Sequence, residues 1–510
     1  MSHMISPAEK ASIESLRQIY ECIVNKTSFR LEAGAGAGKT YSLIKSLIFI
    51  LENQINELNK KNQKVACITY TNIATEEIKK RTDNHPSLFV DTIHSFSWNI
   101  LHVFQNQLRV LISESQSWKT RLNGLDISDY TIRYDLGHPR ISDKEISIHH
   151  DDVIFFMSKM LVYPKFRKYL KSKFPIIFID EYQDTDKELA TSIVSNLIEN
   201  DEGFLIGLFG DHWQKIYDSK ACGLIRSSSG KITEINKNAN FRSDAYIVKV
   251  LNLIRKELPQ EPHNPQAKGS IKVFHTNSWH GERLNGGHWK GDLPADEVAQ
   301  KISGITQQMI ENGWDISSNK SKILFLTNNL IAIEQQFKNL ANCFKYPEEY
   351  LKKENKYILF LLDFIEPVIQ AFKNREYGSI FEFGKNKQYS LSCQDDKRLW
   401  AVTLSQLEQL RNDATIGDII DFVAKSGILI LPEAITKSET RFDELKSINS
   451  ENLNEKDIEF LEFINKIRNI SYQEVINLGE YIDLRTPFST KHGVKGAEFD
   501  NVLVVLGRGW

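Results

Sequence analysis

The sequence predicts an α/β fold built around parallel sheets, and three observations support this prediction. Short apolar runs bounded by turn or charged residues recur along the chain, separated by stretches with helical spacing such as 41–51 and 74–81. The runs are continuous rather than alternating, which is typical of strands buried on both faces. Strand, loop and helix follow in that order, which favours the α/β class. The expected strands are 29–31, 65–70, 176–179, 204–209, 323–326 and 502–506.

Length and composition limit the class of protein. A chain of 510 residues exceeds what one hydrophobic core usually supports, so several domains are expected. The formal net charge is −2, so any nucleic-acid binding must come from a local groove. Five cysteines without a paired spacing argue against a disulfide framework or a zinc site. No apolar run approaches the ~20 residues of a membrane span, and no signal peptide is evident, so we expect a cytoplasmic protein without membrane contact.

Three stretches interrupt the alternation of strands and helices. Residues 98–173 have a helical pattern in which 135–147 resembles a loop, 259–265 is a proline-rich connection, and 345–480 is mostly helical. We therefore expect two α/β domains, each carrying a mostly helical inserted subdomain. The expected bounds are 1–97 with 174–245 for the first domain, 98–173 for its insertion, 246–344 with 481–510 for the second domain, and 345–480 for its insertion.

A glycine-rich segment follows the first expected strand. Residues 33–40 read Ala-Gly-Ala-Gly-Ala-Gly-Lys-Thr and precede a helical pattern, which is the setting of a phosphate-binding loop. Lys39 would reach the β- and γ-phosphates, and the Thr40 hydroxyl would bind Mg²⁺. The strict pattern has glycine where this chain has Ala33. The expected ATP-binding residues of the loop are Ala33, Gly34, Ala35, Gly36, Ala37, Gly38, Lys39 and Thr40.

Two carboxylates follow the strand expected at 176–179. Asp180 would hold Mg²⁺ through water, and Glu181 would polarise the water that attacks the γ-phosphate. The alternative is that both carboxylates cap a helix start. Because a phosphate loop precedes them in the same chain, the catalytic interpretation is favoured.

The phosphate loop and the Asp-Glu-Tyr-Gln-Asp string at 180–184 together resemble the UvrD/Rep branch of superfamily 1 helicases, and further blocks follow in that family's order. The resemblance implies two RecA-like domains with ATP between them. Gln18 would read the adenine, Gln214 would couple the γ-phosphate to DNA, and Phe241 would clamp the adenine ring. Arg242, as an arginine finger, and Glu498, as a ribose contact, would approach from the opposite wall. The implied catalytic residues are Lys39, Glu181, Gln214 and Arg242.

Other blocks imply contacts with single-stranded DNA. Tyr70 at a strand end offers a base an aromatic face, which contributes ~1–3 kcal/mol per base whatever the sequence; its alternative is a half-buried strand aromatic. After Tyr217 the family's usual stacking aromatic is absent, and Trp213 could replace it or pack inward. The implied DNA-binding residues are Tyr70, Thr71, Asn72, Thr92, His94, Ser95, Trp213, Tyr217, Thr490 and His492.

Histidine clusters at 149–150 and at 275–288 lack the spacing of a defined metal site, so exposed loop histidines are expected there. The family's last arginine-bearing block does not follow the strand at 502–506. We therefore expect the printed chain to bind ATP and hydrolyse it slowly.

As a whole, the resemblance implies an ATP- and Mg²⁺-dependent helicase or translocase moving 3′→5′ on single-stranded or partially duplex DNA, in repair or anti-phage defence. Short UvrD-like proteins of this kind occur beside OLD-type nucleases in Gabija-like systems. The alternative is an ATP-gated sensor of DNA ends that regulates a partner nuclease without processive unwinding.

Overall fold

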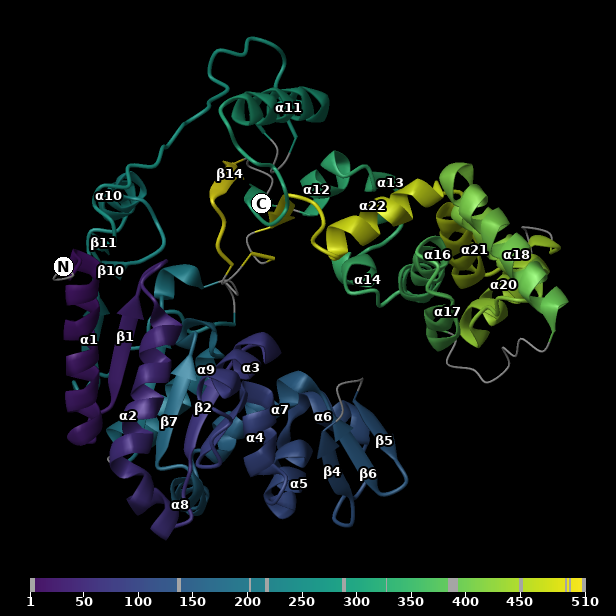
Figure 1. Ribbon diagram of the computed structural model, residues 1–510. Helices are drawn as coiled ribbons and strands as arrows, with labels where there is room; N and C mark the ends of the chain where they lie inside the picture. The colour runs from purple at the N-terminus through teal and green to yellow at the C-terminus, as the bar shows by residue number, and fades with distance from the viewer. Residues whose placement is uncertain are drawn as a thin grey trace. The chain divides into compact units, whose positions relative to one another are not determined.

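The computed structural model divides the chain into two units, residues 1–275 and 276–510, and each is described by itself (Figure 1). The first unit extends past residue 245, where the sequence placed the end of the first domain. The described residues are 5–134, 139–200, 203–215, 220–286, 290–326, 328–383, 393–448, 453–490, 493–494 and 497–506.

A six-stranded parallel sheet forms the centre of the first unit, in the order β3-β2-β7-β8-β1-β9. The sequence predicted four of these strands, and the structure confirms them. It missed the two edge strands, because neither is buried throughout: β9 alternates between exposed and buried residues, and β3 is only partly buried. The bounds are β1 (Phe29–Ala33), β2 (Val65–Thr69), β3 (Leu88–Thr92), β7 (Ile176–Asp180), β8 (Leu205–Gly210) and β9 (Thr233–Lys237).

Helices cover both faces of this sheet. Val65 and Cys67 of β2 pack into one core together with apolar residues of the first three helices, whereas Ala66 and Ile68 pack into a second core on the other face. This two-sided burial is why the apolar runs are continuous. The helices of the first unit are α1 (Pro7–Val24), α2 (Lys39–Lys60), α3 (Asn72–Arg81), α4 (Ile93–Leu101), α5 (Gln105–Glu114), α6 (Gln116–Leu122), α7 (His150–Met160), α8 (Pro164–Lys173), η1 (Tyr182–Asp184), α9 (Lys187–Ile193), η2 (Val194–Glu199), η3 (His212–Gln214) and α10 (Ala245–Ile254).

The insertion between β3 and β7 contains a small sheet as well as helices, so the prediction of a loop at 135–147 is wrong over its described part. Three strands pair in the order β4-β6-β5, beside α5 and α6 in Figure 1: β4 (Thr131–Tyr134), β5 (Arg140–Ser142) and β6 (Glu145–Ile148). Ile146 and Ile148 are buried while their neighbours are half-buried, and Lys144 adopts a positive φ of 57° in the turn between β5 and β6. Such a short alternating strand is hard to distinguish from a loop in one sequence.

The first unit ends with a strand pair that lies beside the glycine-rich loop. Strand β10 (Ala239–Asn240) pairs in parallel with β11 (Glu261–Pro262), and α10 connects them. This pair brings residues around 240 and 260 to the end of β1, from which the loop begins.

The second unit combines a small parallel sheet with a large group of helices. Its strands pair in the order β13-β12-β14, and β12 and β14 confirm the strands expected at 323–326 and 502–506. Residues 345–480 are mostly helical where the structure describes them, as predicted. No helix in the described residues has the length and apolarity that a membrane crossing needs. The bounds are α11 (Ala295–Glu311), β12 (Ser321–Phe325), α12 (Asn328–Glu334), α13 (Lys338–Ala341), α14 (Pro347–Leu351), α15 (Lys356–Phe360), η5 (Leu361–Ile365), α16 (Glu366–Lys373), α17 (Tyr377–Phe383), α18 (Gln394–Asp413), α19 (Ile416–Ser426), α20 (Glu433–Lys446), α21 (Glu455–Arg468), α22 (Tyr472–Ile482), β13 (Phe488–Thr490) and β14 (Asn501–Val505).

Candidate functional site

The glycine-rich loop connects the end of β1 to the start of α2. Gly36 and Gly38 both have φ of 74°, a left-handed conformation that favours glycine. A Cβ on Gly36 would also lie 2.7 Å from Asn240 Oδ1. Ala33, by contrast, is the buried last residue of β1 and needs no such freedom, so the departure from the strict glycine pattern does not disturb the loop.

Side chains from the β10–β11 pair hold this loop from outside. Asn240 Nδ2 and Gln260 Nε2 each donate to the Ala35 carbonyl at 3.1 Å, and the Phe241 N–H donates to the Gly36 carbonyl at 2.8 Å. Two loop carbonyls are therefore engaged on the outer side, which preorganises the loop.

Lys39, the first residue of α2, lies between the two acidic residues that follow β7. Its ammonium forms an ion pair with Glu181 and lies 3.9 Å from Asp180 Oδ1. Burial disfavours the charged ammonium, but the Glu181 and Asp180 carboxylates outweigh it and raise the pKa of Lys39. The three groups come from β7 and the loop, whose strands are separated only by β8.

Glu181 has an unusual backbone for a residue other than glycine. Its φ is 49°, its side chain caps no helix, and Gln183 Nε2 donates to its Oε2 at 2.7 Å. Such a conformation costs of order 1–3 kcal/mol and is frequent at functional sites. The alternative that this carboxylate merely caps a helix is therefore not favoured. Thr40 and buried Asp180 offer hydroxyl and carboxylate oxygens, the ligands that Mg²⁺ prefers.

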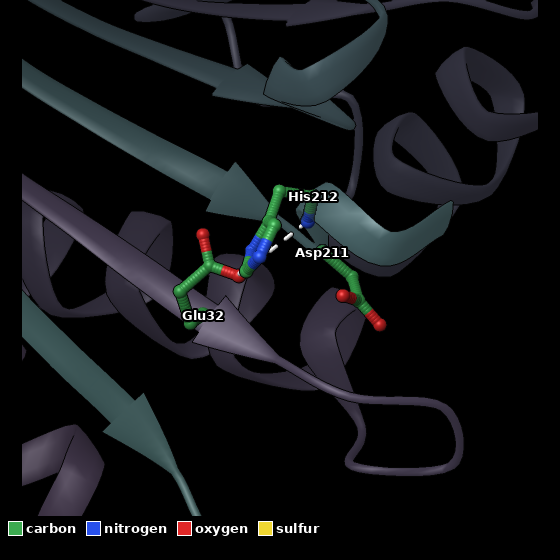
Figure 2. A group of neighbouring side chains, drawn as sticks. All are labelled: Glu32, Asp211 and His212. Atoms are coloured by element: carbon green, nitrogen blue, oxygen red, sulfur yellow. Dashed lines mark hydrogen bonds and ion pairs between the residues drawn. The ribbon is translucent and has the colours of Figure 1, made fainter. Parts of the chain in front are cut away.

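A second charged cluster, which sequence reasoning missed, lies beside the loop at the ends of β1 and β8. Figure 2 shows Glu32 facing the His212 ring, whose Nδ1 lies 3.0 Å from Glu32 Oε2. With Asp211, these residues place possible metal-ligating atoms within 4.8 Å of one another. Arg255 donates to Asp211 Oδ1 at 2.6 Å and to Glu32 Oε2 at 3.4 Å. Because Arg255 pairs with both carboxylates and Arg30 pairs with Glu32 as well, the cluster is an ion-pair network.

This network also orients Gln214, the residue expected to sense the γ-phosphate. Gln214 Nε2 donates to Asp211 Oδ2 at 2.7 Å. The neighbouring Trp213 is half exposed, and the Arg255 guanidinium lies 5.5 Å from its ring centroid. The indole therefore does not pack inward, which was one of the two alternatives for it. The only sequence signal for the network was the presence of two charged residues, Arg30 and Glu32, inside the short strand that precedes the loop.

Three other residues expected to bind nucleotide, Arg242, Phe241 and Gln18, lie outside the loop and the acidic strand end. Arg242 does not approach from an opposite domain: it belongs to the first unit, and a Cβ on Gly36 would lie 2.9 Å from its own Cβ. Phe241 is exposed beside it. Gln18 lies in α1, where its Nε2 donates to Glu14 Oε1 at 2.9 Å.

The residues expected to contact DNA gather at the carboxyl ends of β2 and β3, the same edge of the sheet as the loop, because parallel strands end on one side. Thr71 caps α3, and Thr92 caps α4 and also bonds Ser95. Asn72 begins α3 and is exposed. Tyr70 is half-buried with its hydroxyl enclosed, and this burial raises its pKa well above the ordinary value.

His94 packs against the insertion. Its ring stacks on His150, with centroids 3.5 Å apart. Burial, and then the charge of His150, lower the pKa of His94 to about 4. His149 is the N-cap of α7 and His150 its first residue, and both are partly buried, so the expectation of exposed loop histidines is wrong for this pair. The reason is that Asp152 closes a capping box with His149.

The remaining candidates lie in the second unit or outside the described residues. Thr490 ends β13 and is half-buried, and Glu498 is exposed. Tyr217 and His492 lie outside the described residues.

The parallel sheet, the glycine-rich loop before α2 and the carboxylates at the end of β7 define a P-loop nucleoside triphosphatase. Residues 17–220 match the family model described as AAA domain. The chain is 25% identical to Gabija protein GajB of Bacillus cereus strain HuB5-5, over 69% of this chain and 62% of that protein, so it spans less than two thirds of that relative. It is 24% identical to the GajB of strain VD045, over 92% and 85%. It is also 22% identical to the ATP-dependent DNA helicase Rep of Buchnera aphidicola, over 93% and 84%. These matches show that the chain is similar to the UvrD/Rep-like helicases of superfamily 1.

Proposed function

We propose that this chain uses ATP hydrolysis to move along or unwind DNA. The observation that carries the proposal is the position of Lys39, held between Glu181 and Asp180 at the start of α2. In the free protein these carboxylates balance the ammonium. A bound polyphosphate would take the ammonium as its counter-charge and release Glu181 to accept a proton from water.

Each residue at this sheet edge then has a distinct role. The backbone N–H groups of the loop and the N-terminus of α2 bind phosphate oxygens. Thr40 and Asp180 would hold Mg²⁺, which supplies Lewis-acid stabilisation of phosphate charge. Gln214, oriented by Asp211, links the phosphate to the nearby ends of β2 and β3, where Tyr70 and Thr92 would contact single-stranded DNA.

The biological setting is a separate proposal that rests on the relatives. Two of them are named Gabija proteins. We infer that this chain acts in a Gabija-like anti-phage system, with 3′→5′ movement and an OLD-type nuclease as the partner. The second candidate, a DNA-end sensor without processive unwinding, is favoured by Tyr70, whose hydroxyl is enclosed and whose ring is only partly accessible.

One experiment separates these candidates. ATP hydrolysis by the full chain is measured alone, with single-stranded DNA and with duplex DNA, and strand separation is followed on a duplex with a 3′ overhang. A translocase shows hydrolysis stimulated by single strands together with strand separation. A sensor shows stimulation without separation. Hydrolysis that no DNA changes would contradict both, and Lys39→Ala serves as the inactive control.

A further inference from the structure

A second lysine lies against the glycine-rich loop, although no motif contains it. Lys237 ends β9, where it pairs in register with Ala33, and its side chain is fully buried. Its Nζ donates to the Gly38 carbonyl at 2.9 Å and to Ser42 Oγ at 2.7 Å. It thus bonds the first turn of α2 from the side, between the rings of Tyr41 and Phe241, whose centroids lie 5.6 and 5.9 Å from Nζ.

This ammonium has no acidic partner. In the part of the chain that the structure describes, no carboxylate lies within 4.0 Å of Lys237, and its two hydrogen bonds use two of its three donors. Burying a charge without a counter-charge is costly. The charged groups of the neighbouring elements engage one another or face solvent: Arg30 with Glu32 and Glu234, Arg17 with Glu14 and Glu21, Lys39 with Glu181 and Asp180, and Lys45, exposed over the Tyr41 ring.

We propose that Lys237 is a nucleotide-binding residue, whose buried positive charge is balanced only when a polyphosphate occupies the loop. This inference rests on the proposed ATP site. The N-terminus of α2 is the end of a helix that attracts anions, and Lys237 adds a full charge there. Its position beside Phe241, the ring expected to clamp the adenine, places this charge at the nucleoside end of the phosphate chain.

The proposal has a consequence for pH. Burial lowers the pKa of Lys237 to about 8, so the free protein loses this charge as the pH rises above that value. A bound polyphosphate favours the ammonium and raises its pKa, so binding above pH 8 takes up a proton. ATP affinity must therefore fall as the pH rises through 8. Phosphate groups finish ionising well below this range, and Lys39, whose pKa is raised, stays charged.

The test is calorimetric titration of the full chain with ATP at pH 7, 8 and 9, and at pH 8.5 in two buffers of different ionisation enthalpy. The wild-type protein should lose about tenfold in affinity between pH 7 and pH 9 and take up a proton at pH 8.5. Lys237→Met should bind ATP more weakly at pH 7, with affinity independent of pH. Lys45→Met, which removes an exposed lysine over the same Tyr41 ring, should behave as wild type.

The outcomes separate this inference from the proposed function. If the wild type binds ATP equally at all three pH values without proton uptake, Lys237 only holds the first turn of α2, and the inference is wrong. A loss of affinity in Lys237→Met beside a flat wild-type profile overturns the inference in the same way. If the wild type binds no ATP at any pH, the proposed function fails instead. If Lys237→Met does not fold, the pH dependence of ATP affinity and the proton uptake of the wild-type protein still test the inference.

Discussion

The two units bury charged side chains in different ways. In the first unit, Glu32, Asp180, Asp211 and Lys237 are buried at the ends of neighbouring parallel strands. In the second unit, the buried charges that the structure describes include Glu474, which accepts from the Leu340 N–H at 2.8 Å, and Lys322, which donates to the Thr486 carbonyl at 2.9 Å.

This difference indicates that the buried charges of the first unit serve a chemical site, whereas those of the second unit serve packing. Burial of charge is costly, so several buried charges that converge on one loop indicate a site kept for chemistry. Single charges that bind a nearby backbone group only fix the packing of their own unit. Removing the charges that converge on the loop of the first unit should therefore change nucleotide chemistry, whereas removing Glu474 or Lys322 in the second unit should change stability alone.

The largest effect is expected for Lys39→Ala. The substitution removes the counter-charge of two phosphates and leaves Glu181 and Asp180 to repel them. Charge-assisted hydrogen bonds contribute about 1.5–3 kcal/mol each, so ATP affinity should fall about 10³-fold or more, measured by calorimetry. Lys45→Ala on the same helix is the control. Unchanged affinity in Lys39→Ala would show that this edge is not the nucleotide site.

Glu181→Gln should separate binding from chemistry at the same edge. The amide cannot accept a proton from water, so ATP turnover should fall about 10²–10³-fold while ATP affinity is retained. Turnover is followed by phosphate release, and Glu188→Gln, an exposed carboxylate on α9, is the control. Near-normal turnover would assign the base to another group.

Glu474→Ala tests the structural side of the comparison. The substitution leaves the Leu340 N–H and the Asn339 amide without their acceptor, which should destabilise the second unit by about 1–3 kcal/mol in urea unfolding. ATP affinity of the folded protein should not change. A parallel loss of ATP binding would mean that the two units do not divide their roles in this way.

Tyr70→Ala addresses the DNA edge of the first unit. Loss of a stacking ring should weaken single-strand binding by about 1–3 kcal/mol in fluorescence anisotropy, without altering ATP affinity in the absence of DNA. Tyr70→Phe keeps the ring and should bind as wild type. Because Tyr70 also packs against the core, Trp213→Ala, at a half-exposed position, is a second variant. If all three bind DNA equally well, the sensor function gains support.

The smallest expected effect is a change in the pH dependence of stability, caused by His94, which packs against the insertion. His94 is held neutral with a pKa of about 4, below the ordinary value of 6.5. The unfolded chain therefore binds more protons between these values, and stability is lost as the pH falls from 6.5 towards 4. With allowance for its partial exposure, wild type should lose about 1–2 kcal/mol more than His94→Gln between pH 7 and pH 4.5. His102→Gln, at the exposed end of the same helix, should follow wild type.

Features that are local in the chain could be predicted from the amino-acid sequence. The apolar runs predicted six of the strands. Five of them are continuous because two-sided burial requires continuous apolarity, whereas β14 is apolar although Val502 and Val504 are exposed. Residues 33–40 with Asp180 and Glu181 could be assigned because each motif is contiguous. The edge strands β3 and β9 and the small sheet of β4, β5 and β6 escaped, since half-buried strands carry a weak pattern.

The side chains that surround the loop, in contrast, are set by the tertiary structure. Lys237 bonds Gly38 across 199 residues of chain, and Arg255 reaches Glu32 across 223. No local pattern records such pairs. The sheet order, which places β9 beside β1, brings Lys237 to the loop, and Arg255, which directly follows α10, is brought to Glu32 by the packing of that helix. A sequence does not distinguish a buried lysine at a strand end from a solvated one. The chemistry of Lys237 depends on its burial without a carboxylate partner among the described residues, which only the tertiary structure establishes.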